Sequence, residues 1–307
     1  MKKIAIIGGA GFIGTHTTSL LLNNNYDVTV IDKKENELLK HHSKPFKYIK
    51  CDVTDKNHLR TIMNDYKFDA VYMLAGISDS QENLKSLPDS LEQNIISLTN
   101  VLECVKDFNI KRIIFSSTVW VYSVSKATNV NETTNLPINK SNHIYTSNKL
   151  MCEQLIQHYH QLYNINYTIL RYGVAYGPGC HPSTILSQFI TNAINNKKCI
   201  INGNGSVYRN FLYVTDHARA NMAALNEKAK NKIINVDGNE KITLNCVAET
   251  VKKLNGKIKL EYNDKRAGEY KGKNVSNNRS RKLLNWSPKI NFTTGSKFLY
   301  DYIKGTK

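Results

Sequence analysis

The sequence predicts an α/β protein: a doubly wound parallel sheet followed by a smaller, mixed α/β domain. Three observations support this prediction. Short apolar segments alternate with stretches of helical periodicity, a glycine-rich turn joins the first such segment to the first helix, and the alternation stops at a turn-rich segment near residue 176. Strands that alternate with helices form β-α-β units, and right-handed crossovers then place helices on both faces of a parallel sheet.

The expected elements of the first domain follow one another in a regular order. Helical periodicity is clearest in residues 12–23 and 144–163, where apolar side chains recur with the spacing of one helix face. The expected strands are residues 3–7, 26–31, 46–50, 70–74, 112–115 and 167–171.

The chain changes its pattern after the last of these strands. Residues 176–182 contain two prolines and two glycines and break the alternation. We therefore expect residues 1–172 to form the first domain and residues 173–307 to form mainly the second. Residues 231–237 are a candidate strand that returns to complete the first sheet.

Chain length and composition limit which classes of protein are possible. The 307 residues correspond to about two domains. Hydrophobic residues make up 41% and charged residues 22%, as in globular proteins. No apolar run approaches the ~18 residues of a membrane span, and the polar residues after the first glycines argue against a secretory signal. We expect a cytoplasmic protein that does not bind membranes.

The chain is strongly basic, with 42 Lys and Arg residues against 25 Asp and Glu residues and a net charge of +17. Such a charge attracts phosphates and nucleic acid. The basic residues are scattered and no aromatic-plus-arginine stacking motif accompanies them, so we favour a solvated lysine-rich surface over nucleic-acid binding. The six cysteines form no Cys-x-x-Cys pair, and we expect no metal site.

A glycine-rich turn follows the first strand. Gly8, Gly11 and Gly14 are spaced three residues apart, and Phe12 and Ile13 open the next helix. Such a turn lets the backbone approach a pyrophosphate, and the helix N-terminus supplies free N–H groups with partial positive charge. These residues predict the phosphate-binding turn of a Rossmann-type dinucleotide site.

Asp32 ends the second strand, where a carboxylate accepts hydrogen bonds from an adenosine ribose and repels a 2′-phosphate. This favours NAD over NADP. Lys33 and Lys34 leave some tolerance of NADP open, and the alternative is that Asp32 merely caps a turn.

Tyr145 and Lys149 form a Tyr-x-x-x-Lys pair on one face of an expected helix. Neighbouring cations, here Lys149 and an oxidised nicotinamide, lower the pKa of a phenol from about 10, so Tyr145 would act as a general base near neutral pH. Ser116, Ser117 and Thr118 end a strand at the edge that faces the ligand crevice, where Thr118 can bind a substrate oxygen. The alternatives are a solvated lysine and local backbone bonding by the hydroxyls.

With these motifs the chain resembles the extended short-chain dehydrogenases/reductases, and within them the NAD-dependent nucleotide-sugar epimerase/dehydratase family (UDP-glucose 4-epimerase-like). The match extends over nearly the whole chain. Beyond the motifs above, it rests on Asp52-Val53, Leu74-Ala75-Gly76, Asn94, Val121-Tyr122, Arg171-Tyr172-Gly173, Tyr176-Gly177-Pro178, Gly203-Asn204-Gly205-Ser206, Arg209-Asn210-Phe211, Arg266-Ala267-Gly268-Glu269 and Asn285-Trp286-Ser287-Pro288.

The resemblance implies a site for each ligand. The two arginines of the substrate side would clamp the diphosphate of a sugar nucleotide, because a guanidinium fork fits phosphate oxygens; surface salt bridges are the alternative. The implied substrate contacts are Ser117, Thr118, Tyr145, Arg209 and Arg266. The implied NAD contacts are the glycine turn, Asp32, Asp52, Val53, Leu74, Ala75, Gly76, Asn94, Ser116, Tyr145, Lys149, Tyr172 and Val174.

Departures from the family pattern narrow the reaction. Dehydratases of this family carry an Asp-Glu pair directly after the catalytic threonine, whereas this chain has Val119 and Trp120. Epimerases need neither acid. Val174 stands where many 4-epimerases have an asparagine, and Asn210 stands where aspartate is usual, so the identity of the sugar stays open.

We therefore predict an NAD-dependent nucleotide-sugar 4-epimerase with Tyr145, Lys149 and Thr118 as catalytic residues. It would work through a 4-keto intermediate with transient hydride transfer to bound NAD. The alternatives are a nucleotide-sugar reductase, dehydrogenase or dehydratase, and a non-catalytic dinucleotide- or RNA-binding relative. The resemblance also implies a homodimer paired through helices near residues 90–108 and 144–163.

Overall fold

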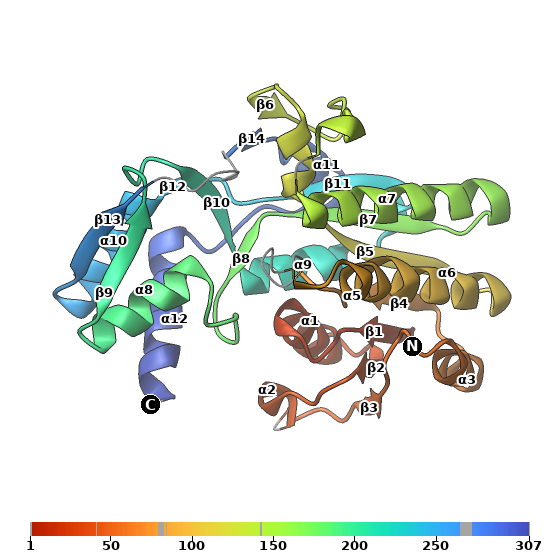
Figure 1. The fold of residues 1–307 in the computed structure, drawn as a ribbon. Coiled ribbons are helices and arrows are strands. Elements are labelled where there is room, and N and C mark those ends of the chain that lie inside the picture. Colours follow the sequence, from red (N-terminus) through yellow and green to blue (C-terminus); the bar gives the residue numbers. More distant parts are fainter. Residues whose placement is uncertain are drawn as a thin grey trace.

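The computed structural model describes residues 2–40, 42–78, 83, 85–141, 143–264 and 272–306. It confirms the α/β class: its main element is a seven-stranded sheet in the order β11-β7-β5-β4-β1-β2-β3 (Figure 1). Every pairing in this sheet is parallel. The strands are β1 Lys3–Ile7, β2 Asp27–Asp32, β3 Lys47–Lys50, β4 Ala70–Met73, β5 Arg112–Thr118, β7 Tyr167–Tyr172 and β11 Lys232–Val236.

Helices cover both faces of this sheet, as its nearly continuous apolar strands require. In β1, Ile4 and Ile6 pack into one core and Ala5 and Ile7 into the other, because successive side chains of a strand point to opposite faces. The helices and single turns of this half are α1 Phe12–Asn23, α2 Glu37–Lys40, α3 Lys56–Tyr66, α5 Leu87–Leu91, η1 Glu92–Ile96, α6 Ser97–Asp107, η2 Val119–Val124, η3 Ile138–Lys140 and α7 Ile144–Tyr163.

The second half of the chain contributes to the same sheet. Residues 232–236, inside the segment that we expected to return, form β11 and pair with β7 from Lys232↔Thr168 to Val236↔Tyr172. At that edge α11 Asn278–Leu284 packs against β11 and against η4 Glu227–Ala229, whereas α9 Val214–Ala223 packs mainly against α1.

The remaining elements lie beyond the carboxyl ends of the parallel strands (Figure 1). A third core joins most of them, with Tyr176, Phe189, Phe211, Val247 and Leu299 among its buried members. The strands are β8 Val174–Tyr176, β10 Tyr208–Tyr213 and β12 Lys241–Thr243 in one sheet, β9 Lys198–Asn202 with β13 Lys259–Asn263, and β6 Asn129–Val130 with β14 Asn274–Val275. The β6–β14 pair lies outside the third core and packs with η2 in a separate cluster. The helices are α8 Ile185–Ile194, α10 Leu244–Asn255 and α12 Phe292–Gly305.

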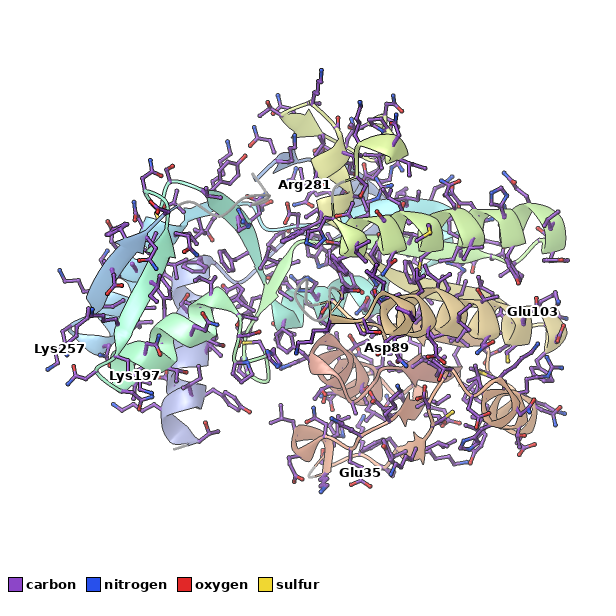
Figure 2. The ribbon with its side chains drawn as sticks, in the orientation of Figure 1. Glu35, Asp89, Glu103, Lys197, Lys257 and Arg281 are labelled. Atoms are coloured by element: carbon purple, nitrogen blue, oxygen red, sulfur yellow. The ribbon has the colours of Figure 1, made fainter. Side chains whose placement is uncertain are left out.

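Charged side chains lie at the periphery of both halves. Lys197 and Lys257 project from the outer end of the second half, whereas Arg281 and Glu103 lie on other parts of the surface (Figure 2). No helix of the described residues is long and apolar enough to span a membrane.

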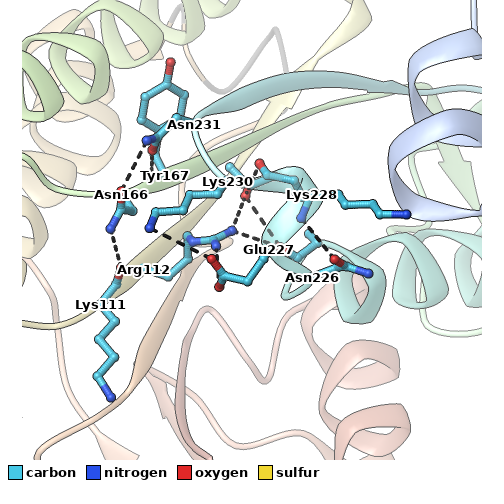
Figure 3. A network of polar contacts seen from close by, with 12 residues as sticks. Lys111, Arg112, Asn166, Tyr167, Asn226, Glu227, Lys228, Lys230 and Asn231 are labelled. Atoms are coloured by element: carbon cyan, nitrogen blue, oxygen red, sulfur yellow. Dashed lines mark hydrogen bonds and ion pairs between the residues drawn. The ribbon is translucent and has the colours of Figure 1, made fainter.

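A polar network closes the amino-terminal end of the main sheet (Figure 3). The Arg112 guanidinium donates to Thr168 Oγ1 at 3.0 Å and pairs with Glu227 at 3.2 Å, and Lys230 lies 3.9 Å from the same carboxylate. This end lies opposite the carboxyl edge, where open α/β sheets bind ligands.

Candidate active site

The glycine turn packs closely against the ends of β2 and β4. Gly8 has φ +79°, its N–H donates to Ile31 O at 2.9 Å, and a Cβ there would come within 2.5 Å of the backbone nitrogen of Ala75. A Cβ on Gly14 would overlap the carbonyl oxygen of Gly8. Helix α1 starts at Phe12 with no side-chain cap and no acidic residue in its first turn. Its N-terminus therefore keeps free N–H groups and partial positive charge, which suits a pyrophosphate.

Asp32 braces this turn from the end of β2. Its Oδ2 accepts from Ala10 N–H at 3.0 Å and its Oδ1 from Lys34 N–H at 3.3 Å. Asp32 therefore caps local backbone N–H groups, which was the alternative to a ribose contact. Its carboxylate still has free lone pairs that can accept a hydrogen bond from a ligand. Lys33 pairs with Asp52 at 2.8 Å and donates to Gln93 at 2.9 Å, so its charge is already partly balanced.

Asn94 presents an acceptor that no described residue satisfies. It lies in η1, a π-helical turn of the kind that often marks functional sites. Its Nδ2 donates to Ser90 O at 2.9 Å, whereas its Oδ1 is buried without a partner. A Cβ on Gly76 would lie 2.7 Å from this oxygen. Because an unpaired buried acceptor costs free energy, the arrangement fits a hydrogen-bonding ligand next to Gly76.

The other residues expected to contact NAD lie at or near the carboxyl edge of the main sheet, and not all of their side chains point to the same place. Leu74 and Ala75 both donate their N–H groups to Ile7 O, which holds the end of β4 against β1. Val53 is buried, Val174 opens β8, and the Tyr172 ring packs on His217 of α9 with its hydroxyl bonded to Asn221. The Tyr172 side chain therefore points to α9.

Tyr145, Lys149 and Thr118 meet at the carboxyl end of β5. Lys149 is buried and its Nζ donates to Ser116 O at 2.8 Å, while the Ser116 hydroxyl donates to Met73 O. The same Nζ lies 5.9 Å from the centre of the Tyr145 ring. The Thr118 hydroxyl lies beside the phenol, where it partly offsets the effect of burial on the pKa of Tyr145. One strand end and one helix thus assemble the set that the motif predicted.

Burial governs the pKa of Tyr145 in the protein by itself. It raises the pKa to about 12, and the Thr118 hydroxyl offsets part of that rise. The lowering expected from Lys149 together with an oxidised nicotinamide stays a prediction for the NAD-bound site. Burial also lowers the pKa of Lys149.

An aromatic cluster surrounds the phenol. The centroid of Trp120 lies 5.5 Å from His143 and 6.4 Å from Tyr145, both in edge-on contact, and His143 contacts Tyr145 in the same way. Burial lowers the pKa of His143, so its ring is neutral near pH 7. Sequence reasoning missed His143, whose one signal was its place two residues before Tyr145.

Ser117 lies in a different environment from the catalytic set. Its hydroxyl donates to Glu153 at 2.5 Å, and Arg171 donates to the same carboxylate at 2.7 and 3.0 Å. Arg171 also bonds to the Tyr122 hydroxyl at 3.0 Å. This buried network joins β5, α7 and β7, and it engages the Ser117 hydroxyl that we expected to contact substrate.

The structure places one of the two expected arginines. Arg209 lies in β10, half-buried, and its Nη1 donates to Tyr208 O at 2.9 Å. Arg266 belongs to residues 265–271, which lie outside the described residues.

A glycine turn at the switch point of a parallel sheet, with a tyrosine, lysine and threonine at its carboxyl edge, defines a dinucleotide-dependent enzyme of the short-chain dehydrogenase/reductase class. The chain belongs to the NAD dependent epimerase/dehydratase family, whose sequence model matches residues 4–237. NAD is the cofactor of this family, and the open helix N-terminus and the unpaired Asn94 acceptor fit it.

Relatives and solved structures agree with this assignment. A UDP-glucuronate 4-epimerase from Thermodesulfobacterium geofontis is 31% identical over 99% of this chain and 97% of its own length. A UDP-glucose 4-epimerase from Thermotoga maritima, solved with UDP-glucose, superposes with a TM-score of 0.92 at 26% identity over 99% of both chains. A UDP-glucuronic acid 4-epimerase from Bacillus cereus, in complex with UDP-glucuronic acid and NAD, gives 0.89 at 29% identity and covers 99% of this chain and 100% of that one. Relatives named dTDP-D-glucose 4,6-dehydratase also match.

Proposed function

We propose that this chain is an NAD-dependent 4-epimerase of a nucleoside-diphosphate sugar. One observation carries the proposal: Tyr145, Thr118 and Lys149 meet at the end of β5, while the following turn η2, Val119–Val124, contains no carboxylate. Elimination of water needs an added acid and base at this place, and 4-epimerisation does not. The 4-epimerases among the relatives support the same reaction.

The proposed NAD site extends from the α1 N-terminus past Asp32 to Gly76 and Asn94. When bound, NAD supplies the hydride acceptor and donor for the carbon that changes configuration. Tyr145 takes the proton of the 4-hydroxyl group and later returns it, and Thr118 holds the same oxygen by a hydrogen bond. Lys149, anchored on Ser116 O, provides positive charge that favours the phenolate.

We place the sugar nucleotide between the carboxyl edge of the sheet and the second half of the chain. Arg209 and Arg266 would bind its diphosphate. Ser117, whose hydroxyl is bonded to Glu153, would hold the end of β5 in place beside the substrate. In this arrangement residues 1–172, completed by β11, hold the cofactor, and residues 173–307 mainly hold the substrate. We also propose a homodimer in the cytoplasm.

Product analysis tests this proposal. The purified protein is incubated with NAD and, separately, with UDP-glucose and UDP-glucuronate, and the sugars are identified by NMR. We expect a mixture of the two 4-epimers from at least one substrate, with no net accumulation of NADH. Stoichiometric NADH would instead identify a dehydrogenase, and a 4-keto-6-deoxy sugar would identify a dehydratase.

A further inference from the structure

A buried carboxyl group outside the proposed chemistry lies at the carboxyl end of β11. Asp237 directly follows Val236, the last residue of that strand, and its side chain is 0% exposed. Carboxyl groups are rarely buried unless they are paired. Within the described part of the chain, however, no lysine or arginine forms an ion pair with Asp237, so neutral hydrogen-bond donors must satisfy it.

Those donors come from the substrate half of the molecule. Asn210 Nδ2 donates to Asp237 Oδ2 at 2.8 Å, and Gly238 N–H donates to Oδ1 at 2.9 Å. The Asn277 side chain bonds to both the N–H and the carbonyl of Asp237, at 3.1 and 2.8 Å. A Cβ on Gly173 would overlap Asp237 Oδ1. The carboxyl group thus fills the space where the end of β7, the end of β11 and β10 meet.

Asn210 extends the contact to two further segments. Its Nδ2 also donates to Lys273 O at 3.3 Å, and Lys273 Nζ donates to Ser125 O at 2.9 Å and to Ala127 O at 2.8 Å. Ser125 directly follows η2, the turn that begins after Thr118. A continuous set of hydrogen bonds therefore joins β11, β10, the segment at Lys273 and the end of η2.

We propose that Asp237 is a positioning residue for substrate binding, which acts through Asn210 to fix β10 and its Arg209 against the catalytic edge of the main sheet. The inference rests on the proposed function, because Arg209 is there given to the substrate diphosphate. It also accounts for Asn210, which stands where the family has aspartate: a second carboxylate at that position would face Asp237 at hydrogen-bond distance, and like charges so close do not both ionise.

Exchange of the two side chains is the sharpest test. D237A removes the acceptor, N210D places two carboxyl groups together, and the double variant N210D/D237N moves the carboxyl group from β11 to β10. We expect D237A to raise the KM for the sugar nucleotide about tenfold, with kcat and NAD affinity within about threefold of the wild type. N210D should also raise KM, and the double variant should return it to within about threefold of the wild type.

D216N is a control at another buried carboxyl group. Asp216 is also 0% exposed; it pairs with Arg219 and accepts from Lys289 N–H at 2.8 Å and Ile290 N–H at 3.0 Å, away from β11. We expect D216N to lower Tm while the KM stays near the wild-type value. If D237A fails to fold, the exchanged pair decides: recovery of KM relative to N210D supports the inference.

Two results would overturn the positioning role. One is a folded D237A whose KM stays within about twofold of the wild type. The other is a double variant no better than N210D. A wild-type protein that turns over no sugar nucleotide would contradict the proposed function instead; calorimetric titration with UDP then replaces KM and tests the pair independently.

Discussion

Tyr145 is the group proposed to move the proton of the reacting hydroxyl. Tyr145→Phe deletes one oxygen and keeps the ring in contact with Trp120 and His143. We expect turnover to fall about 10²- to 10⁴-fold, the usual contribution of a general acid–base group, with NAD affinity unchanged. Initial rates and an NAD titration measure both effects.

Tyr159→Phe provides the control on the same helix. The Tyr159 hydroxyl bonds to Glu103 at 2.8 Å, away from Thr118, so its loss should leave turnover near the wild-type rate. A loss of less than about tenfold in Tyr145→Phe would show that another group is the base.

The buried Asp237 carboxyl group should make the stability of the protein depend on pH. Burial raises its pKa to about 7, while hydrogen bonds from Asn210 and Gly238 lower it in part. Between about pH 4 and pH 7 the native protein therefore binds a proton that the unfolded chain has released, and stability falls as pH rises. Relative to D237N, the wild type should lose on the order of 4 kcal/mol across this interval, since one pKa unit corresponds to about 1.4 kcal/mol.

Urea unfolding of both proteins at several pH values measures this difference. The Tyr208 phenol on β10, whose pKa is raised by burial and in part by the charge of Asp237, is present in both proteins. A pH-independent difference between wild type and D237N would show that Asp237 is not protonated in the native state at low pH.

Local spacing explains which site residues the sequence could predict. Tyr145 and Lys149 share a helix face because they are four residues apart, and Thr118 was expected beside them because ligands bind at the carboxyl ends of parallel strands. No such spacing or edge rule indicates that Ser117 bonds to Glu153, or that Asp237, after β11, bonds to Asn210 on β10. Such contacts depend on tertiary packing, which periodicity does not encode.

At the scale of elements, β10 carries Arg209 on the substrate side. Arg209→Ala should weaken sugar-nucleotide binding about tenfold to a hundredfold, because hydrogen bonds to charged groups contribute about 1.5–3 kcal/mol. NAD affinity should stay unchanged. Calorimetry with each ligand measures the two effects.

Lys228 and Lys230 supply the control for charge. They lie at the amino-terminal end of the sheet beside the Arg112 network, opposite the site (Figure 3). Removing both lysines changes the net charge more than Arg209→Ala does, yet should leave binding near its original value. An equal loss in the two variants would mean that diffuse positive charge governs binding.

Sequence periodicity predicted most, but not all, of the elements. The six strands expected in residues 1–172 all form, with ends shifted by no more than three residues; β1 is Lys3–Ile7 as expected, whereas β2 is Asp27–Asp32 and β4 ends at Met73. The π-turn η1 and the β9–β13 pairing were not predicted, because one is a local irregularity and the other joins strands about 60 residues apart.

At the scale of the whole molecule, large apolar side chains are exposed on α5, η1 and α7, and η1 packs against both α5 and α7. Leu91 and Ile96, on α5 and η1, and Met151 and Leu162, on α7, are each at least 40% exposed. Helices α6 and α7 lie next to each other (Figure 1). A second copy of the chain would bury this surface.

Light scattering at micromolar concentration tests the proposed dimer. We expect a mass near twice the 34.9 kDa of one chain. Met151→Glu with Leu162→Glu should give a monomer, because a buried charge without a partner opposes association. A wild-type monomer would refute the dimer.

In the proposed reaction the hydrogen at C4 of a nucleotide sugar is removed and returned to the other face of the same carbon. UDP-glucose or UDP-glucuronate carrying deuterium at C4, whichever turns over, tests this when the product is examined by NMR. We expect a 4-epimer that keeps the deuterium at C4 while NADH does not accumulate. Loss of the deuterium to solvent, or its appearance in released NADH, would refute the 4-epimerase mechanism.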